Sequence, residues 1–357
     1  MKRQQGAVLI MVLWLAIVMT VLVTVMAANI RLSATTAFHH QEGVREYADM
    51  ISALNRAEME LILERMPVPA DQPMELNEFG EQPEPLNRYN GQALTLHYPA
   101  PENTEIRIID HAGKINLNRI NANNLRLLIE NRLGPGFDPR EVQAYMAAWS
   151  DWVDLNSLVT PGGGAEDDYY LEQDPPYRAR NNPDLESVDE ILLIRGFAEL
   201  FAGVNLDAAF TVYGNSRNGA VNPNLATREA LALLPGMDAE LIEEILAYRQ
   251  TRDIRNIPQI GEIIPLEQLE EVSPWLEIGW SSTFSVYVYP KEASLSEGEE
   301  TEVDAQSENL STTSGTVPGT AFHQIIEVDR GTARGRVFKA DPYAPLPDLR
   351  PPQLEDD

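Results

Sequence analysis

The sequence predicts an α+β fold in which a long N-terminal helix packs on an antiparallel sheet and a large all-α domain is inserted in that sheet. Residues 7–30 contain no charged side chain, and helical periodicity continues from there to residue 66. Strand-like alternation of apolar and polar residues occurs in two separate groups, near residues 92–117 and 283–339. The segment between these groups has helical spacing almost throughout, and such a change of element type marks an inserted domain.

The first predicted element is one continuous helix over residues 7–66, which Pro67 and Pro69 end. At 1.5 Å per residue this helix is about 90 Å long. Its first half can cross a bilayer, because a spanning helix needs about 20 apolar residues, and its second half is amphipathic. Lys2 and Arg3 precede the apolar run and favour a cytoplasmic N-terminus. We therefore expect the first half to anchor the chain and the second half to pack against a sheet.

A small residue, Gly6, lies between this basic leader and the apolar run. A secretory signal is normally cleaved after its apolar region, not before it. The arrangement resembles the signal of type IV pilins and pseudopilins, in which a prepilin peptidase cleaves after the glycine and methylates the next residue. The resemblance implies that residues 1–6 are a leader, that cleavage lies between Gly6 and Ala7, and that Ala7 is N-methylated. An ordinary signal peptide cleaved near Ala27 or Ala28 is the alternative.

One position departs from the usual pilin pattern. Met11 stands where these families usually have a glutamate at the fifth mature position. That departure is typical of the K-type minor pseudopilin of the type II secretion system, and residues 7–14 also resemble the start of that family. K-type proteins have a pseudopilin sheet that is interrupted by a helical domain, and the pattern of this sequence is the same. The resemblance therefore covers nearly the whole chain and implies the pseudopilin fold.

The predicted sheet domain has a first part over residues 67–117 and a second part over residues 276–340. Residues 291–320 contain seven acidic side chains and no aromatic residue, which predicts a mobile loop. Residues 341–357 are Pro-rich and acidic and predict an irregular tail. The strands are expected at residues 92–98, 105–110, 114–117, 283–289, 323–329 and 334–339. The inserted domain is expected over residues 118–275, with helices at residues 123–132, 139–153, 187–194 and 227–251.

An acidic, glycine-containing segment inside the insert is the strongest candidate for a binding site. Six carboxylate or amide side chains lie within 18 residues around Gly162–Gly163–Gly164. Calcium prefers six to eight oxygen ligands on backbone that can fold around the ion, although the EF-hand spacing is missing. The alternative is a solvated acidic loop that ends a helix. The K-type resemblance implies a structural calcium site here, and the candidate ligands are Asp151, Asp154, Asn156, Glu166, Asp167 and Asp168.

The segment from residue 221 to residue 249 is similar to a helix-hairpin-helix unit, with Leu234–Pro235–Gly236 as its hairpin. Such units often bind DNA phosphates through hairpin amides. Here acidic residues follow the hairpin, and the chain has a net charge of −28 from 27 basic and 55 acidic residues. Phosphate binding needs the opposite sign, so we expect a structural scaffold and no nucleic-acid partner. The absence of cysteine excludes disulfides and thiolate sites.

The resemblance implies a minor pseudopilin at the tip of the type II secretion pseudopilus, needed for its assembly and for export of folded proteins across the outer membrane. It implies three kinds of protein partner: the I- and J-type minor pseudopilins, the major pseudopilin and prepilin peptidase. It also implies a single-pass inner-membrane protein with its C-terminal bulk in the periplasm. We expect no enzyme, because the five histidines are scattered and no nucleophile or phosphate-loop motif is present. Two alternatives remain: a signal-anchored periplasmic helix-hairpin-helix protein that binds DNA, and a secreted calcium-dependent enzyme.

Overall fold

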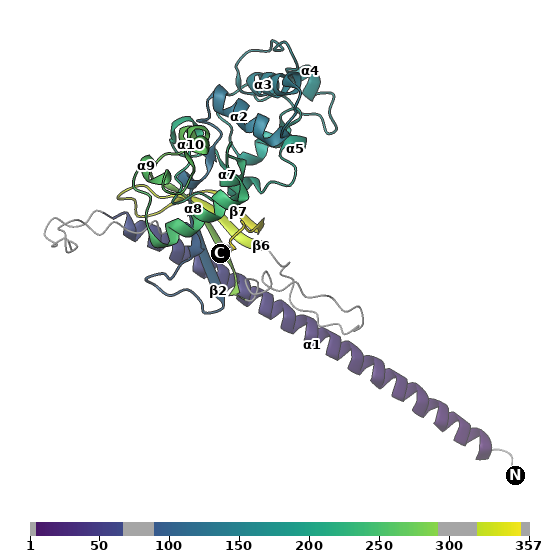
Figure 1. Ribbon diagram of the computed structural model, residues 1–357. Coiled ribbons are helices and arrows are strands. Elements are labelled where there is room, and N and C mark those ends of the chain that lie inside the picture. Colours follow the sequence, from purple (N-terminus) through teal and green to yellow (C-terminus); the bar gives the residue numbers. More distant parts are fainter. Residues whose placement is uncertain (1–4, 67–88, 292–319, 351–357) are drawn as a thin grey trace, which may run out of the picture.

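The computed structural model describes residues 5–66, 89–291 and 320–350 (Figure 1). The first element is the 60-residue helix α1, Gln5–Glu64. Thr20 and Thr24 lie in its apolar half, and their hydroxyls donate to the carbonyls of Ala16 and Thr20, each at 2.8 Å. These polar side chains therefore leave no unpaired donor on the apolar surface. The continuous helix predicted from residue 7 onward is confirmed, and the predicted leader overlaps its first turn.

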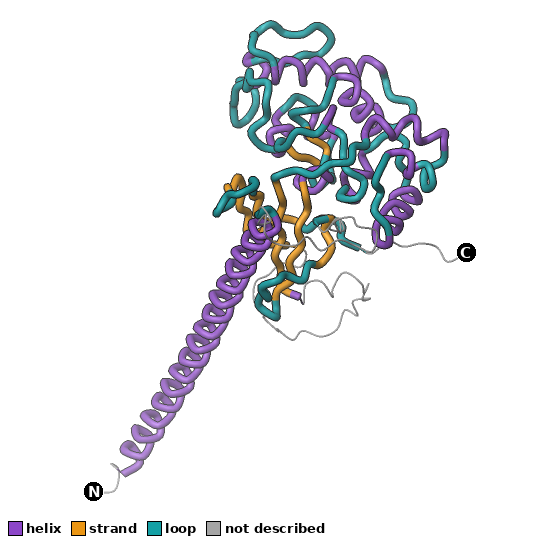
Figure 2. The backbone as a smooth tube through the Cα atoms, turned by 90° about the vertical axis from the view of Figure 1, so that its left-hand side faces the viewer, coloured by secondary structure: helices purple, strands orange, loops and turns teal. Residues whose placement is uncertain are grey.

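The C-terminal part of α1 packs on one face of a sheet. Ala53, Leu54, Ala57 and Leu61 are at most 5% exposed and lie in one cluster with apolar side chains of the sheet. Ala57 lies four and three residues after Ala53 and Leu54, and Leu61 lies four residues further on, so all four side chains share one side of the helix. The apolar half of α1 extends beyond the sheet and makes no such contacts (Figures 1 and 2).

The main sheet has five strands in the order β1-β2-β5-β6-β7, and all neighbours are antiparallel. The strands are β1 Asn90–Ala93, β2 Thr104–Asp110, β5 Thr283–Pro290, β6 Thr320–Glu327 and β7 Arg336–Pro345. β2 and β5 are central neighbours, with Asp110 opposite Phe284. The chain therefore leaves the sheet and returns to it at adjacent positions, as expected for an inserted domain.

The insert lies beyond one end of this sheet (Figure 2). Its α-helices are α2 Ala122–Leu133, α3 Pro139–Val153, α4 Asp167–Tyr170, α5 Phe197–Leu200, α6 Leu206–Ala209, α7 Arg228–Leu233, α8 Ala239–Thr251, α9 Ile257–Ile260 and α10 Leu266–Val272. Short 3₁₀ helices are η1 His111–Gly113, η2 Val188–Leu193, η3 Arg217–Gly219 and η4 Ser273–Trp275. The longer helices have side-chain caps at their N-termini, such as Asp138 for α3 and Asp238 for α8. A single large apolar core of its own holds the insert together.

The predicted α+β class and the helical interruption of the sheet are confirmed. The strand expected over residues 114–117 as part of the sheet domain is β3, Ile115–Asn116, and it lies outside the main sheet. It pairs in parallel with β4, Phe210–Thr211, because the insert supplies its neighbour. The segment predicted as a helix over residues 187–194 is the 3₁₀ helix η2.

Several strand predictions are wrong at their ends. The strand expected over residues 323–329 is β6, which begins three residues earlier and ends at Glu327. The strand expected over residues 92–98 ends at Ala93, because the backbone N–H of His97 donates to Glu60 Oε2 on α1 and not to a strand. The predicted irregular tail begins at residue 341, but β7 continues to Pro345. Proline is tolerated there since β7 is an edge strand, where one row of N–H groups has no ladder partner. The predicted loop 291–320 lies almost entirely outside the described residues.

Candidate functional site

The end of helix α3 brings two carboxylates together. Asp151 and Asp154 are three residues apart and lie on the same side of the helix terminus. Asp151 is fully buried, and both of its carboxylate oxygens accept from the backbone N–H of Thr160 at 3.1 Å. These hydrogen bonds therefore hold the loop after α3 against the end of α3.

A glycine makes this close return possible. A Cβ atom added to Gly164 would lie 2.2 Å from Asp151 Oδ2 and under 3 Å from the backbone of Thr160. The Gly164 N–H also donates to the Thr160 carbonyl at 3.1 Å. Any side chain here would displace the buried carboxylate, so the loop depends on glycine at this position.

The returning loop places a third carboxylate beside the first two. Glu166 is 4% exposed, and neither of its carboxylate oxygens has a hydrogen-bond partner. One oxygen each of Asp151, Asp154 and Glu166 lies within 4.8 Å of the others. Burial, with the negative charges of Asp151 and Asp154 adding to it, raises the pKa of Glu166. We call these three residues the carboxylate cluster.

The other candidate ligands lie outside the carboxylate cluster. Asp167 forms an ion pair with Arg178 at 2.6 Å and accepts from the Ala179 N–H at 3.0 Å. Asp168 is exposed. Asn156 is exposed too, and its Oδ1 accepts from the Leu158 N–H at 2.8 Å. Sequence spacing alone could not separate these roles, since all six residues lie in one irregular segment.

The carboxylate cluster has the chemistry of a divalent cation site. Three acidic side chains converge, two of them are buried, and one has two unpaired oxygens. Buried anions without partners cost several kcal/mol, whereas a hard cation with oxygen ligands offsets that cost. The residues present therefore fit calcium, and backbone or water oxygens would complete its shell.

Buried aromatic side chains lie next to the carboxylate cluster. The rings of Trp152 and Tyr170 meet edge to face at 5.0 Å, and both are at most 2% exposed. Trp152 Nε1 donates to Glu190 at 2.9 Å. The guanidinium of Arg195 faces the Gly164 carbonyl at 3.4 Å and lies over the ring of Tyr169. These rings hold the end of α3 in place, and their role is packing.

A second polar centre, which sequence reasoning missed, joins the insert to the sheet. Lys114 is fully buried, and its ammonium donates to the Asp207 carbonyl at 2.6 Å and to Ser285 Oγ at 2.7 Å. The same hydroxyl contacts a ring nitrogen of His111 at 2.9 Å and of His323 at 3.1 Å. We call these residues the junction network. Its members come from β5, β6, α6 and the chain between β2 and β3, so no local pattern could reveal it.

Burial controls the charges in the junction network. It lowers the pKa of Lys114 to about 8 and the pKa of His323 to about 3, and the positive charge of Lys114 also lowers the latter. The pKa of His111 is well below its usual value for the same reasons. Both histidines are neutral at pH 7, and none of these groups reaches solvent. The network fixes the insert on the sheet rather than presenting a reactive group.

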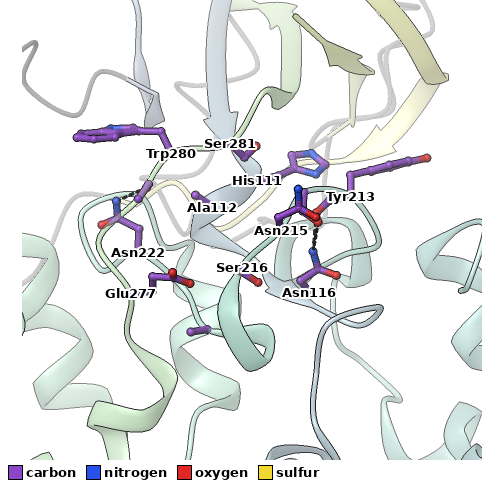
Figure 3. A pocket seen from close by; sticks show the side chains of 13 residues that line it. His111, Ala112, Asn116, Tyr213, Asn215, Ser216, Asn222, Glu277, Trp280 and Ser281 are labelled. Atoms are coloured by element: carbon purple, nitrogen blue, oxygen red, sulfur yellow. Dashed lines mark hydrogen bonds between the residues drawn. The ribbon is translucent and has the colours of Figure 1, made fainter. Parts of the chain in front are cut away.

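A small polar pocket opens beside this junction (Figure 3). Its volume is about 110 Å³, which fits a few water molecules. Asn116 Nδ2 donates to the Tyr213 carbonyl at 2.7 Å, and Asn222 Nδ2 donates to the Gly279 carbonyl at 2.7 Å. Each amide bond therefore joins one of the two connections to the body of the insert.

The helix-hairpin-helix segment is α7 and α8 with Leu234–Pro235–Gly236 between them. Asp238 caps α8 and accepts from the Leu241 N–H at 2.9 Å, so the helix N-terminus that would meet a phosphate is already occupied. The Arg249 guanidinium donates inward to the Ala226 carbonyl at 2.6 Å. Both contacts are made within the insert.

In the described part of the chain, one helix is long and apolar enough to cross a membrane: the stretch Leu9–Glu64 of α1. The apolar side chains from Leu9 to Ile30 are all exposed, and none of the spanning window is buried against the protein. This helix is a candidate membrane anchor.

The chain was compared with protein families and with solved structures. Residues 113–202 match the family model described as type II secretion system protein K, first domain. The chain is also similar to one chain of the GspK–GspI–GspJ complex of the type 2 secretion system from enterotoxigenic Escherichia coli. The identity is 16% and the TM-score 0.47, over 87% of this chain and 98% of that chain. No curated protein matches the chain.

The family match contains α2, α3, the carboxylate cluster and η2. The match therefore bears on the insert and not on the N-terminal helix. Over residues 113–202 the chain is similar to protein K of the type II secretion system, which agrees with the K-type resemblance of the N-terminal residues.

Proposed function

We propose that this protein is a minor pseudopilin at the tip of the type II secretion pseudopilus, where it supports pseudopilus assembly and the export of folded proteins. The observation that carries this proposal is the division of α1. Its first half is an exposed apolar helix, and its second half packs on the sheet. The same chain contains a segment that matches the protein K family. A subunit of this shape can leave a membrane and place its apolar half among the equivalent helices of other subunits.

The position of the insert supports a terminal place in the fibre. The insert extends from the end of the sheet away from the apolar half of α1 (Figure 1). A subunit stacked beyond this end would occupy the same space. In pilins the fifth-position glutamate pairs with the N-terminal amine of a neighbour, and Met11 cannot do so. This subunit lacks one charge contact of the repeating fibre.

Other minor pseudopilins of the I and J types are the proposed partners, with the major pseudopilin below them and prepilin peptidase acting on the precursor. The similar Escherichia coli chain was solved in a GspK–GspI–GspJ complex. On α1, Phe38, Val44 and Tyr47 are between 52% and 63% exposed where the helix approaches the sheet. Large apolar side chains exposed on one helix mark an interaction surface. Helices of the two partners would cover them.

We further propose that the insert binds a structural calcium ion through Asp151, Asp154 and Glu166, and that the protein has no enzymatic activity. The ion would offset the mutual repulsion of three converging carboxylates, two of them buried. The bulk of the protein would lie in the periplasm, with α1 in the inner membrane.

Processing and assembly test the proposal separately. Mass spectrometry of the mature protein should find methylated Ala7 at the N-terminus, and a start near Ala28 would contradict the pseudopilin assignment. For assembly, the full chain should co-purify with its I- and J-type partners, and Val44→Glu with Tyr47→Glu should abolish this. The control is Leu266→Glu on α10, where the leucine is 77% exposed but remote from α1. Loss of co-purification in the control as well would contradict the assignment of the surface to α1.

A further inference from the structure

One loop of the insert exposes apolar side chains that the proposed function does not use. It runs from Asp154, at the end of α3, to Glu166, just before α4. Leu155 is 80% exposed, Leu158 is 78% exposed and Val159 is 57% exposed. Three large apolar residues within five positions, all facing water, form a local patch that costs free energy unless something covers it.

The loop is held in this form by its own side chains. Asp154 Oδ1 accepts from the Asn156 N–H at 3.0 Å, and Asn156 Oδ1 accepts from the Leu158 N–H at 2.8 Å. Asp151 accepts from the Thr160 N–H at the far end of the apolar stretch. The leucines are therefore kept outward by hydrogen bonds on both sides, and they cannot fold back onto the insert without breaking them.

The size of the patch decides what kind of surface covers it. A stable protein interface buries about 800 Å² on each partner, from about 20 to 30 residues. Three apolar side chains on a narrow loop supply only a small part of that area. They match the other common use of an exposed apolar patch, which is shallow insertion into the interfacial region of a bilayer, where no shape complementarity is needed.

The charges around the loop favour a zwitterionic lipid over an anionic one. Residues 155–165 carry no charge, whereas Asp154 and Glu166 flank them and the whole chain has a net charge of −28. Acidic surroundings repel anionic headgroups. A zwitterionic lipid surface accepts the uncharged loop without this penalty.

The position of the loop indicates that it would contact a different membrane from the one that holds α1. Helices α3 and α4, which flank the loop, lie at the end of the insert farthest from α1 (Figure 1). The apolar half of α1 points the other way. With α1 in one membrane, the loop faces away from that membrane and toward a second one.

We infer that the loop 155–159 is a second, weak membrane contact, which inserts Leu155, Leu158 and Val159 into a zwitterionic lipid surface opposite the membrane that holds α1. The inference does not depend on the calcium proposal, because the hydrogen bonds above hold the loop.

The test uses the full chain held in lipid nanodiscs by α1 and mixed with separate, sucrose-loaded vesicles of phosphatidylcholine and phosphatidylethanolamine. The protein should sediment with these vesicles above the background of empty nanodiscs. Leu155→Ser with Leu158→Ser should lower the bound fraction about tenfold at subsaturating lipid, since each buried leucine side chain contributes about a tenfold factor and insertion is partial. Leu158→Trp should raise it, because tryptophan favours the bilayer interface.

Leu266→Ser, which changes an equally exposed leucine on α10, is the matched control and should bind as the parent does. Vesicles of phosphatidylglycerol should bind less than the zwitterionic ones. Three results would overturn the inference: no sedimentation of the parent protein, full binding by the double variant, or an equal loss in the Leu266 control. The first is also the outcome expected if the patch contacts only another protein.

Discussion

Calcium dependence is the sharpest test of the carboxylate cluster. The perturbation is Glu166→Gln, which keeps the size of the side chain and removes its charge. Glu166 is the best position, because both of its oxygens are buried without a partner and neighbouring carboxylates raise its pKa. The charged side chain is thus unfavourable without a cation and favourable with one.

The magnitude follows from linkage. An ion that binds only the folded state stabilises it by about 2.7 kcal/mol at a hundredfold excess over its Kd. For a unit of this size each kcal/mol corresponds to roughly 2–4 °C in Tm. Calcium should therefore raise the Tm of the insert transition by about 5–10 °C, and chelation should reverse this. Magnesium should act poorly, since it demands compact octahedral geometry and releases water reluctantly.

The variant should reverse the order of stability. In chelator, Glu166→Gln should melt at or above the parent, because one of three converging charges is gone. In calcium, it should melt below the parent, because a ligand is lost. Asp168→Asn is the control, since Asp168 is exposed and outside the cluster, and it should behave as the parent in both buffers.

The assay is differential scanning calorimetry with isothermal titration of calcium into the metal-free protein. If the segment is only a solvated acidic loop, calcium and magnesium should both stabilise the protein weakly. The order of the Tm values of the parent and Glu166→Gln should then be the same in chelator and in calcium. Absence of saturable calcium binding, or a calcium response retained in full by Glu166→Gln, would refute the reasoning.

Three further predictions concern single positions. Gly164→Ala should abolish calcium binding and lower the free energy of unfolding by roughly 1–3 kcal/mol, because its Cβ would meet a buried carboxylate at 2.2 Å. Urea unfolding measures this loss, and Gly279→Ala is the control, since a Cβ at that position has open space. The pKa of His323 is lowered to about 3 in the folded state, so it contributes stability that is present above pH 6.5 and is lost as the pH falls toward 3. His323→Gln should flatten this loss, which we expect to be roughly 2–5 kcal/mol, whereas His40→Gln, at an exposed histidine, should not. Gly6→Val should leave the precursor uncleaved on a gel, and normal maturation of that variant would contradict the assigned cleavage site.

Several features could be predicted because their causes are local. The apolar first half of the long N-terminal helix follows from the uncharged run of residues 7–30, and the end of the helix follows from Pro67. The bounds of α3 match the prediction for residues 139–153 because Asp138 caps it and Pro139 suits the first turn. The interruption of the sheet was also visible, since strand and helix patterns differ in period.

The membership of the carboxylate cluster could not be predicted. Asp167 and Asp168 are next to Glu166 in the sequence, yet Asp167 turns to Arg178 and Asp168 faces solvent. Asp151 is the central member because the loop returns to it, and that return depends on the contact between Gly164 and Thr160. Spacing in an irregular segment does not determine direction, so residue type alone could identify only the region.

The sequence by itself predicted the long apolar helix, the α+β class, the place of the insert and the K-type resemblance, because each rests on residue type and periodicity along the chain. Only the tertiary structure decided which carboxylates meet and how the insert is fastened to the sheet. Ser285 meets Lys114 across 171 positions and His323 across 38. The register of β5 with its neighbours brings them together, and register depends on the packing of whole strands rather than on any local run of residues.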